Sequence, residues 1–526
     1  MLANITKSRA YQIICTSLFG LVLVALPFTS FPPLRQIAGS LVAPLSAIPL
    51  AGIMLVWLLP YLVRKGQLPS EILPLLYFVA VALAVSAGAF FLDGFYTRGK
   101  DFLDQSLRAF VTVGIGLSFY ITLSAYMQDR SILRQGLRFI YIAAGLVILW
   151  SIFEIYLIQT YGSPRFYPAW VVNFRAALVY KVPGLIYSNR VTGFAYEPSW
   201  YVLFFDLTLF PIWLSSVFQR KSLFKTRLWV FQVEDLLLTV GAIVFTFSFP
   251  RIGLIALFAM IAYLALIGAQ KLNKKITAWV ISQKKLKLQD TFLFRALITL
   301  VLLIIFAGLI AGAIAGVVKI ASQTDYRYQL FIDQVLKADI SDLSLSEDEI
   351  IIMARRLAFY ERTVFWFGGW NIFKDYPFGV GLGNAGFYFI ERMNPLGYGS
   401  YEIRNLIFQA DHLINTKALW LRLLSETGFI GFGVFITWVY VLWRSAGLIQ
   451  KSQHTVMKIV GLAGKLYILA YIVEGFGVDS FAIPYHWIMA SFITAGGLIA
   501  RKEIEHNRTL VEKSTSPDPF AVSNQA

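Results

Sequence analysis

The chain has 526 residues, of which 57% are hydrophobic and only 14% carry a charge. Its mean hydropathy of +0.65 leaves too little polar surface to cover a soluble globule of this length, so the composition predicts an integral membrane protein. The formal net charge is +16. This charge reflects either a nucleic-acid partner or the topology of a membrane protein, and the loops decide between the two.

Apolar runs of about 18 to 25 residues, long enough to cross about 30 Å of hydrocarbon, recur along the chain. None shows the alternation of an outer-membrane strand, so we predict an all-α polytopic membrane protein with about twelve transmembrane helices. The first run is followed by two prolines rather than by a small-residue cleavage site, so we expect a retained span. The predicted spans lie near 11–29, 37–63, 71–92, 107–127, 137–160, 198–218, 231–249, 252–270, 291–321, 424–443, 459–477 and 484–500.

Lysine and arginine are concentrated in every second short loop, which predicts that these loops and both termini are cytoplasmic. The net charge is then mostly a topological bias, and no nucleic-acid partner is expected. On this topology the domains are the first nine spans over 1–321 with an extracytoplasmic loop at 161–197, a large extracytoplasmic loop domain at 322–423, the last three spans over 424–500, and a disordered cytoplasmic tail at 501–526.

Several common kinds of site have no sequence signal in this chain. Cys15 is the only cysteine and lies inside the first predicted span, so neither a disulfide framework nor a thiolate metal cluster is expected. The four histidines are scattered, and HExxH, CxxC and paired-aspartate motifs are all missing from the sequence. We therefore expect no metal and no cofactor, and the lack of a Walker A or GxGxxG motif argues against nucleotide hydrolysis.

The large loop is predicted to be structured and to contain short helices. Ser346 and Glu349 have the spacing of a capping box ahead of an apolar run, which predicts a helix over 346–370 that places Arg355 and Arg362 on one face. The turn that follows, 375-DYPFGVGLGNAGF-387, is rich in glycine, and we expect its backbone amides to approach a ligand closely.

Three arginines from separate segments, Arg190, Arg251 and Arg362, are placed at the same membrane face by this topology. An arginine at a hydrocarbon boundary is costly unless it has a partner or a function, and its planar donors suit a diphosphate. The alternative is that each one reaches the lipid headgroups or pairs with a neighbouring carboxylate. We predict that together they bind a diphosphate.

Other polar and aromatic residues of this face are candidates for chemistry. Glu197 is either the structural partner of Arg190 or a general base, because a carboxylate in a partly dehydrated cleft can gain proton affinity. His412 is a second candidate for proton transfer. Tyr196 and Trp200 can stack on a sugar ring, although an interfacial aromatic belt explains most aromatic residues in such a chain.

Four motifs occur in order: 190-RVTGFAYEPSW-200, 247-FSFPRIG-253, Arg362 and Trp366 followed by 375-DYPFGVGLGN-384, and 423-LLSETGFIGF-432. Together they resemble the O-antigen polymerase and O-antigen ligase superfamily over roughly 188–432. The resemblance implies a GT-C-like fold and a metal-independent glycosyltransferase of the bacterial inner membrane. It also implies an undecaprenyl-diphosphate-linked glycan donor held at the extracytoplasmic face by Arg190, Arg251 and Arg362, with Asn384 and Asn415 as further candidates for acceptor or sugar binding.

The chain departs from the family pattern at the family histidine, which usually lies about nine residues before the glutamate of the "E-x-G" motif. Counting back from Glu426 reaches Lys417, and His412 lies five positions earlier. The proton-handling or orienting role therefore falls to His412, Lys417, Asn415 or Glu197.

Three functional hypotheses follow. The first is a polymerase that joins lipid-linked repeat units into O-antigen or exopolysaccharide, with membrane lipid around it and with a chain-length regulator and a flippase as candidate partners. The second is a ligase that transfers a finished glycan to lipid A core or to a protein. The third is a non-enzymatic transporter of polysaccharide or solute, which should show internal repeats or charged residues deep within spans.

Overall fold

The structure is a computed structural model that describes residues 8–38, 40–92, 99–180, 190–248, 251–282, 296–302, 346–356, 359–410 and 412–515, with scattered positions between 304 and 319. The elements of the amino-terminal part are α2 (Arg9–Val24), α3 (Pro32–Ala38), α4 (Ala47–Ile53), η1 (Met54–Leu58), α5 (Leu59–Val63), η2 (Ser70–Ile72), α6 (Leu73–Ala89), α7 (Phe102–Tyr126), α8 (Arg130–Tyr161), η3 (Pro164–Phe166) and α9 (Ala169–Leu178). The central elements are α10 (Pro198–Phe204), η4 (Phe205–Leu209), α11 (Phe210–Gln219), the antiparallel strands β1 (Arg227–Leu228) and β2 (Phe231–Gln232), α12 (Val233–Thr246) and α13 (Arg251–Ser282). The carboxyl-terminal elements are α16 (Glu347–Arg356), α17 (Tyr360–Asp375), α18 (Ala385–Arg392), η5 (Pro395–Gly399), α19 (Tyr401–Phe408), α20 (Leu419–Ile449), α21 (Thr455–Glu474) and α22 (Tyr485–Thr515).

Seven helices among the described residues are long and apolar enough to cross a membrane, and each coincides with a predicted span. They are Ser70–Ala89, Phe102–Tyr126, Arg130–Tyr161, Pro198–Gln219, Arg251–Trp279, Leu419–Ile449 and Thr455–Glu474. A polytopic, all-α membrane protein is therefore confirmed, while the count of twelve spans stays a prediction.

The other five predicted spans have different outcomes. The runs near 11–29 and 37–63 contain the shorter apolar helices Arg9–Val24 and Ala47–Val63. The run near 231–249 contains α12, which has 14 residues, and the run near 484–500 is the first half of α22. The run near 291–321 lies mostly outside the described residues.

The tail differs from its prediction. α22 continues to Thr515, so residues 501–515 form a helix where the sequence predicts a disordered tail. This stretch is rich in glutamate, lysine and arginine, which favour helices. Glu503 also anchors it, because its carboxylate accepts the Ser452 hydroxyl at 2.9 Å and lies 3.4 Å from the Arg130 guanidinium.

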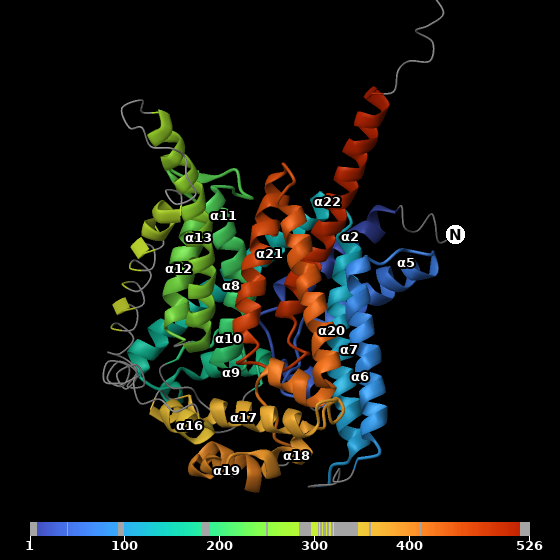
Figure 1. Cartoon of the computed structure of the whole chain (residues 1–526), viewed down its shortest axis with the longest axis vertical. Helices are drawn as coiled ribbons and strands as arrows, with labels where there is room; N and C mark the ends of the chain where they lie inside the picture. The colour runs from blue at the N-terminus through green and yellow to red at the C-terminus, as the bar shows by residue number, and fades with distance from the viewer. Residues whose placement is uncertain are drawn as a thin grey trace, which may run out of the picture.

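Helices α16–α19 form a layer across one end of the helical bundle, and we call this layer the cap (Figure 1). The cap has a small apolar core of its own, and its largest helix, α17, packs against α16, α18 and α20. The carboxyl end of α22 and the start of α2 lie at the opposite end of the bundle (Figure 1). The predicted loop domain is therefore helical over its described part.

The helix predicted over 346–370 is two helices. It begins as expected, since the Ser346 hydroxyl accepts the Glu349 N–H at 3.4 Å. α16 then ends at Arg356, where the Phe359 N–H donates to the Ala354 carbonyl at 2.8 Å, the wide turn that closes many helices. The prediction that Arg355 and Arg362 share one helix face is therefore wrong, because they lie on α16 and α17.

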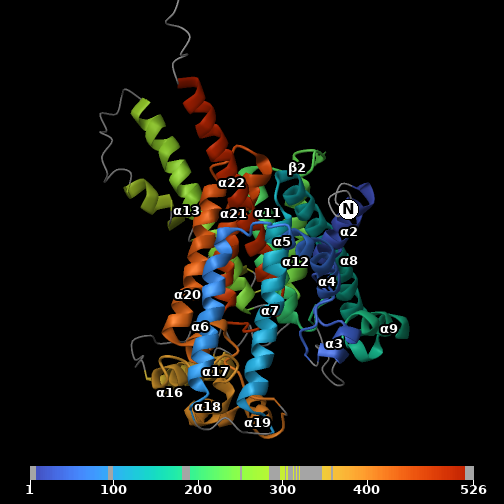
Figure 2. The same ribbon diagram turned by 90° about the vertical axis from the view of Figure 1, so that its right-hand side faces the viewer.

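The glycine-rich turn joins the cap to the bundle. The Val380 and Gly381 N–H groups donate to the Ser425 and Glu426 carbonyls, both at 3.0 Å, and the Leu382 N–H donates to the Ser86 hydroxyl at 2.9 Å. Figure 2 shows the cap helices α18 and α19 at the lower ends of α6 and α7. These three amides therefore bind protein groups rather than the ligand that the sequence predicts.

Candidate active site

A cavity of about 1170 Å³ lies between the cap and the adjacent end of the bundle. Its walls come from the loop before α10, the first turn of α13, the start of α17, the loop before α20, and the loop that follows α21. Eight of the ten candidate residues line it, namely Arg190, Glu197, Trp200, Arg251, Arg362, His412, Asn415 and Lys417. Tyr196 and Asn384 are not among the lining residues.

Arg190 is fixed to the end of α12. Its Nε and Nη2 atoms both donate to the Ser248 carbonyl, at 2.9 and 2.8 Å. The residues that follow are held by Glu154 of α8, whose buried carboxylate accepts the Thr192 N–H at 3.1 Å and the Gly193 N–H at 2.8 Å. Gly193 has a φ of +55°, a conformation that glycine adopts without strain. Residues 190–193 are therefore attached to α8 and to the residues that follow α12.

Arg251 and Arg362 approach the cavity from different directions. Arg251 is the first residue of α13, and its guanidinium lies 4.7 Å from the centre of the Phe359 ring. Arg362 belongs to the cap helix α17, and its Nη1 donates to the Gly477 carbonyl at 2.8 Å. The amino-terminal end of α13 adds its own positive dipole end to this wall. The three predicted arginines therefore line one cavity, and Arg108 and Arg422 line it as well.

Glu197 directly precedes α10 and lines the cavity. The Ser199 hydroxyl donates to its Oε1 atom. The neighbouring Tyr196 and Trp200 rings lie 5.4 Å apart, and the Tyr196 N–H donates to the Thr29 hydroxyl at 2.9 Å. Partial burial raises the pKa of the Tyr196 hydroxyl, and the Glu197 carboxylate raises it further. Trp200 therefore lines the cavity, and the Tyr196 ring packs against it outside the lining.

Lys417 lies nine residues before Glu426, where the resemblance leads one to expect a histidine. Its ammonium pairs with the Glu402 carboxylate of α19 and lies 4.5 Å from the centre of the Phe365 ring. The Asn415 side-chain oxygen accepts the Lys417 N–H at 3.2 Å, which fixes the loop in a conformation with a φ of +48° at Lys417. Because its side chain is held by Glu402 and the Phe365 ring, Lys417 is better placed to orient a substrate than to remove a proton.

Asn384 is fully buried behind the cavity wall. Its Nδ2 donates to the Ser106 hydroxyl of α7 at 2.8 Å, and the residue directly precedes α18. The prediction of a sugar ligand at Asn384 therefore disagrees with its position, because the side chain ties the cap to the bundle instead.

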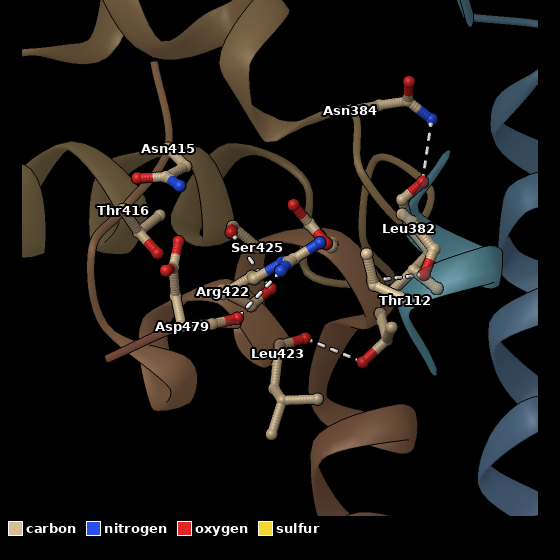
Figure 3. A network of polar contacts seen from close by, with 12 residues as sticks. Thr112, Leu382, Asn384, Asn415, Thr416, Arg422, Leu423, Ser425 and Asp479 are labelled. Carbon is tan, nitrogen blue, oxygen red and sulfur yellow. Dashed lines mark hydrogen bonds and ion pairs between the residues drawn. The ribbon is translucent and has the colours of Figure 1, made fainter. Parts of the chain in front are cut away.

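The structure adds cavity residues that the sequence reasoning missed. Arg422, near the start of α20, donates from Nε to the Glu426 carboxylate at 2.9 Å and from Nη1 to the Asp479 carbonyl at 2.8 Å (Figure 3). Its guanidinium also lies 5.2 Å from the centre of the Phe481 ring. The sequence did contain a signal for this site, because Arg422 and Glu426 are opposite charges four residues apart inside an apolar run.

Residues 236–436 match a family model described as O-antigen ligase. The match begins in α12, includes the described cap and ends within α20, so it contains Arg251, Arg362 and Lys417 and leaves out Arg190 and Glu197. No curated protein matches the chain. The predicted resemblance to the O-antigen polymerase and ligase superfamily is thereby confirmed over residues 236–436.

Proposed function

We propose that the protein is a metal-independent glycosyltransferase that joins undecaprenyl-diphosphate-linked oligosaccharide repeat units into O-antigen or exopolysaccharide. The proposed location is the extracytoplasmic face of the bacterial inner membrane, with the cap on that face and both termini in the cytoplasm. The observation that carries the proposal is the convergence of Arg190, Arg251 and Arg362 on one cavity between the cap and the membrane helices.

The arginine wall suits the leaving group of this reaction. Each described anchor, the Ser248 carbonyl for Arg190 and the Gly477 carbonyl for Arg362, orients a guanidinium without adding a negative charge. A planar guanidinium binds two phosphate oxygens at once, and groups fixed in advance stabilise charge that develops in the transition state. The arginines then serve the purpose that a divalent cation serves in other transferases.

The proposed reaction is a displacement at the anomeric carbon of the donor. The acceptor sugar hydroxyl attacks that carbon, the bond to the diphosphate oxygen breaks, and the hydroxyl proton passes to a general base. Glu197 is the favoured base, because it lines the cavity and is the next candidate along the loop from Arg190. Lys417 is disfavoured by its pairing with Glu402. His412 lines the same cavity and remains the alternative base.

A ligase is the second candidate function, and the description of the matching family model favours it. A ligase would use the same donor and the same arginine wall but transfer the glycan to lipid A core or to a protein. The transporter hypothesis has less support, because the matching family consists of glycosyltransferase-like enzymes.

The test is a transfer assay with purified full-length protein and a lipid-linked repeat-unit donor. Arg251→Lys keeps the charge but loses the planar fork, so transfer should fall by about tenfold to a hundredfold, the equivalent of about 1.5 to 3 kcal/mol. Arg220→Lys is the matched control, because Arg220 pairs with Asp235 away from the cavity lining. Equal transfer by the two variants would overturn the arginine clamp.

The product and the base are tested in the same assay. A ladder of lipid-linked polymers supports the polymerase, and a single glycan joined to an added lipid A core acceptor supports the ligase. Glu197→Gln should retain donor binding and lose turnover. If Glu197→Gln transfers normally and His412→Ala does not, the base is His412.

A further inference from the structure

Two buried carboxylates, Asp206 and Glu474, lie next to the arginine wall and have no part in the proposed reaction. Asp206 belongs to η4, a π-helical turn within the α10–α11 span, and its side chain is fully buried. Glu474 is the last residue of α21, is 5% exposed, and lines the cavity. Ionisable residues inside membrane spans are costly, and π turns are frequent at functional sites.

The start of α13 packs directly on the Asp206 carboxylate. A Cβ atom added to Gly253 would lie 2.6 Å from Asp206 Oδ2, so this position requires glycine. A Cβ atom added to Gly477 would lie 3.6 Å from Glu474 Oε2, and the Gly477 carbonyl accepts the hydrogen bond from Arg362. The two carboxyl groups therefore lie between the first turn of α13 and the guanidinium of Arg362.

The two carboxyl groups come from packed elements, η4 and α21, and flank consecutive residues of α13. Asp206 Oδ2 lies beside Gly253, and Glu474 Oε2 lies beside Gly477, which packs against Ile252, so the two groups interact. No donor among the described residues reaches either Asp206 oxygen or the Oε1 atom of Glu474. Two ionised carboxylates have only acceptor atoms and repel each other in a medium of low dielectric constant, so a hydrogen bond between them needs one proton. The pair with one proton has a net charge of −1.

From the cap, Arg362 donates to the carbonyl of Gly477, the residue beside the Glu474 carboxyl group, and its positive charge therefore lies near that group. A charge of −1 complements one guanidinium, whereas a charge of −2 or 0 would leave the local charge unbalanced beside the cavity. We propose that Asp206 and Glu474 share a single proton and form a positioning pair that holds Arg362 against the cavity wall. This role rests on the proposed function, but the shared proton does not.

The proton is detected without any substrate, by infrared spectroscopy of the full-length protein in lipid nanodiscs. A protonated carboxylic acid has a C=O stretching band that an ionised carboxylate lacks. In both Asp206→Asn and Glu474→Gln the amide N–H can replace the shared proton and the remaining carboxylate is ionised. We expect the wild-type spectrum to contain one buried acid band that each single variant loses entirely. If each variant lost only half of the band, the wild-type pair would hold two protons. If the variants did not differ from wild type, the pair would hold none. Either result overturns the proposal.

Transfer activity tests the positioning role. Asp206→Asn keeps the charge of −1 and should stay within a few-fold of wild type. The double variant with Asp206→Asn and Glu474→Gln has no charge, so the KM for the donor should rise by about tenfold or more, with a smaller change in kcat. Asp235→Asn is the control, because Asp235 is a carboxylate in the first turn of α12 and does not line the cavity. An unchanged KM in the double variant would refute the positioning role.

The remaining outcomes separate the two proposals. If the wild type has the acid band but transfers no glycan, the proposed function fails and the shared proton stands. If the double variant does not fold, the infrared spectra of the single variants still decide whether the pair shares one proton.

Discussion

The break in α20 provides the sharpest test of how the cap is attached to the bundle. Gly428 has a φ of 65° and a ψ of −174°, a combination that is essentially restricted to glycine. The interruption leaves the Ser425 and Glu426 carbonyls available for the Val380 and Gly381 N–H groups of the glycine-rich turn. We therefore expect Gly428→Ala to weaken the joint between the cap and α20.

The size of the effect follows from two terms. A Cβ atom at Gly428 would lie 2.5 Å from the Phe378 carbonyl oxygen, and backbone cannot move aside as a flexible side chain can. The strained backbone costs about 1 to 3 kcal/mol, and the displacement of packed backbone costs about 1 to 3 kcal/mol more. Gly433 lies in the same helix and has open space around its Cα, so Gly433→Ala should be neutral or stabilise the helix by up to about 1 kcal/mol.

The assay is thermal unfolding of the purified full-length variants in detergent, followed by the transfer assay below the unfolding temperature. Gly428→Ala should unfold at a clearly lower temperature and transfer poorly, whereas Gly433→Ala should match wild type in both. If Gly428→Ala were as stable and as active as Gly433→Ala, the break in α20 would not be needed to seat the cap, and the argument would be wrong.

Three other predictions concern the loop, the metal and the topology. Glu154→Ala leaves the buried N–H groups of Thr192 and Gly193 without their acceptor and should destabilise the protein by about 2 to 5 kcal/mol in denaturant unfolding, while Glu154→Gln should cost less. If the proposed arginine clamp serves in place of a divalent cation, transfer should be unchanged by a chelator; a strict requirement for magnesium or manganese would contradict the clamp. A phosphatase fused after Gly399 should be active outside the cytoplasm and a fluorescent protein fused after Thr515 inside it, and the opposite pattern would place the cavity on the wrong face.

The spans were predictable where hydrophobic length alone decides the structure. The sequence could not show where the second helical run begins, because that is settled by distant backbone contacts. The long helical part of the run near 37–63 begins only at Ala47, because Ala43 pairs with the earlier loop. The Ala43 N–H donates to the Thr29 carbonyl at 3.0 Å, and the Ala43 carbonyl accepts the Phe31 N–H at 2.8 Å. Such pairing leaves no trace in hydrophobic periodicity.

The candidate site was predictable to the extent that topology determines it. Sidedness placed Arg190, Arg251 and Arg362 on one face, and they line one cavity. The reasoning failed at Asn384, because a polar residue in a loop motif can bond a buried hydroxyl of a neighbouring helix as readily as it binds a sugar. It also missed Glu474, because a single carboxylate at the end of an apolar run does not interrupt the pattern of a span.

The cavity depends on the contact between the cap and the bundle, since each contributes part of the wall. From the cap, Arg362 donates to the Gly477 carbonyl, and the Trp366 Nε1 donates to the neighbouring Phe476 carbonyl at 3.1 Å. These two bonds fix α17 to the loop after α21 at a site separate from the joint at Gly428. A shift of the cap by one ångström would therefore move Arg362 relative to Arg190 and Arg251, which are fixed to membrane helices. Because a diphosphate clamp needs all three guanidinium groups in register, substitutions at the joint should impair transfer even though they touch no substrate.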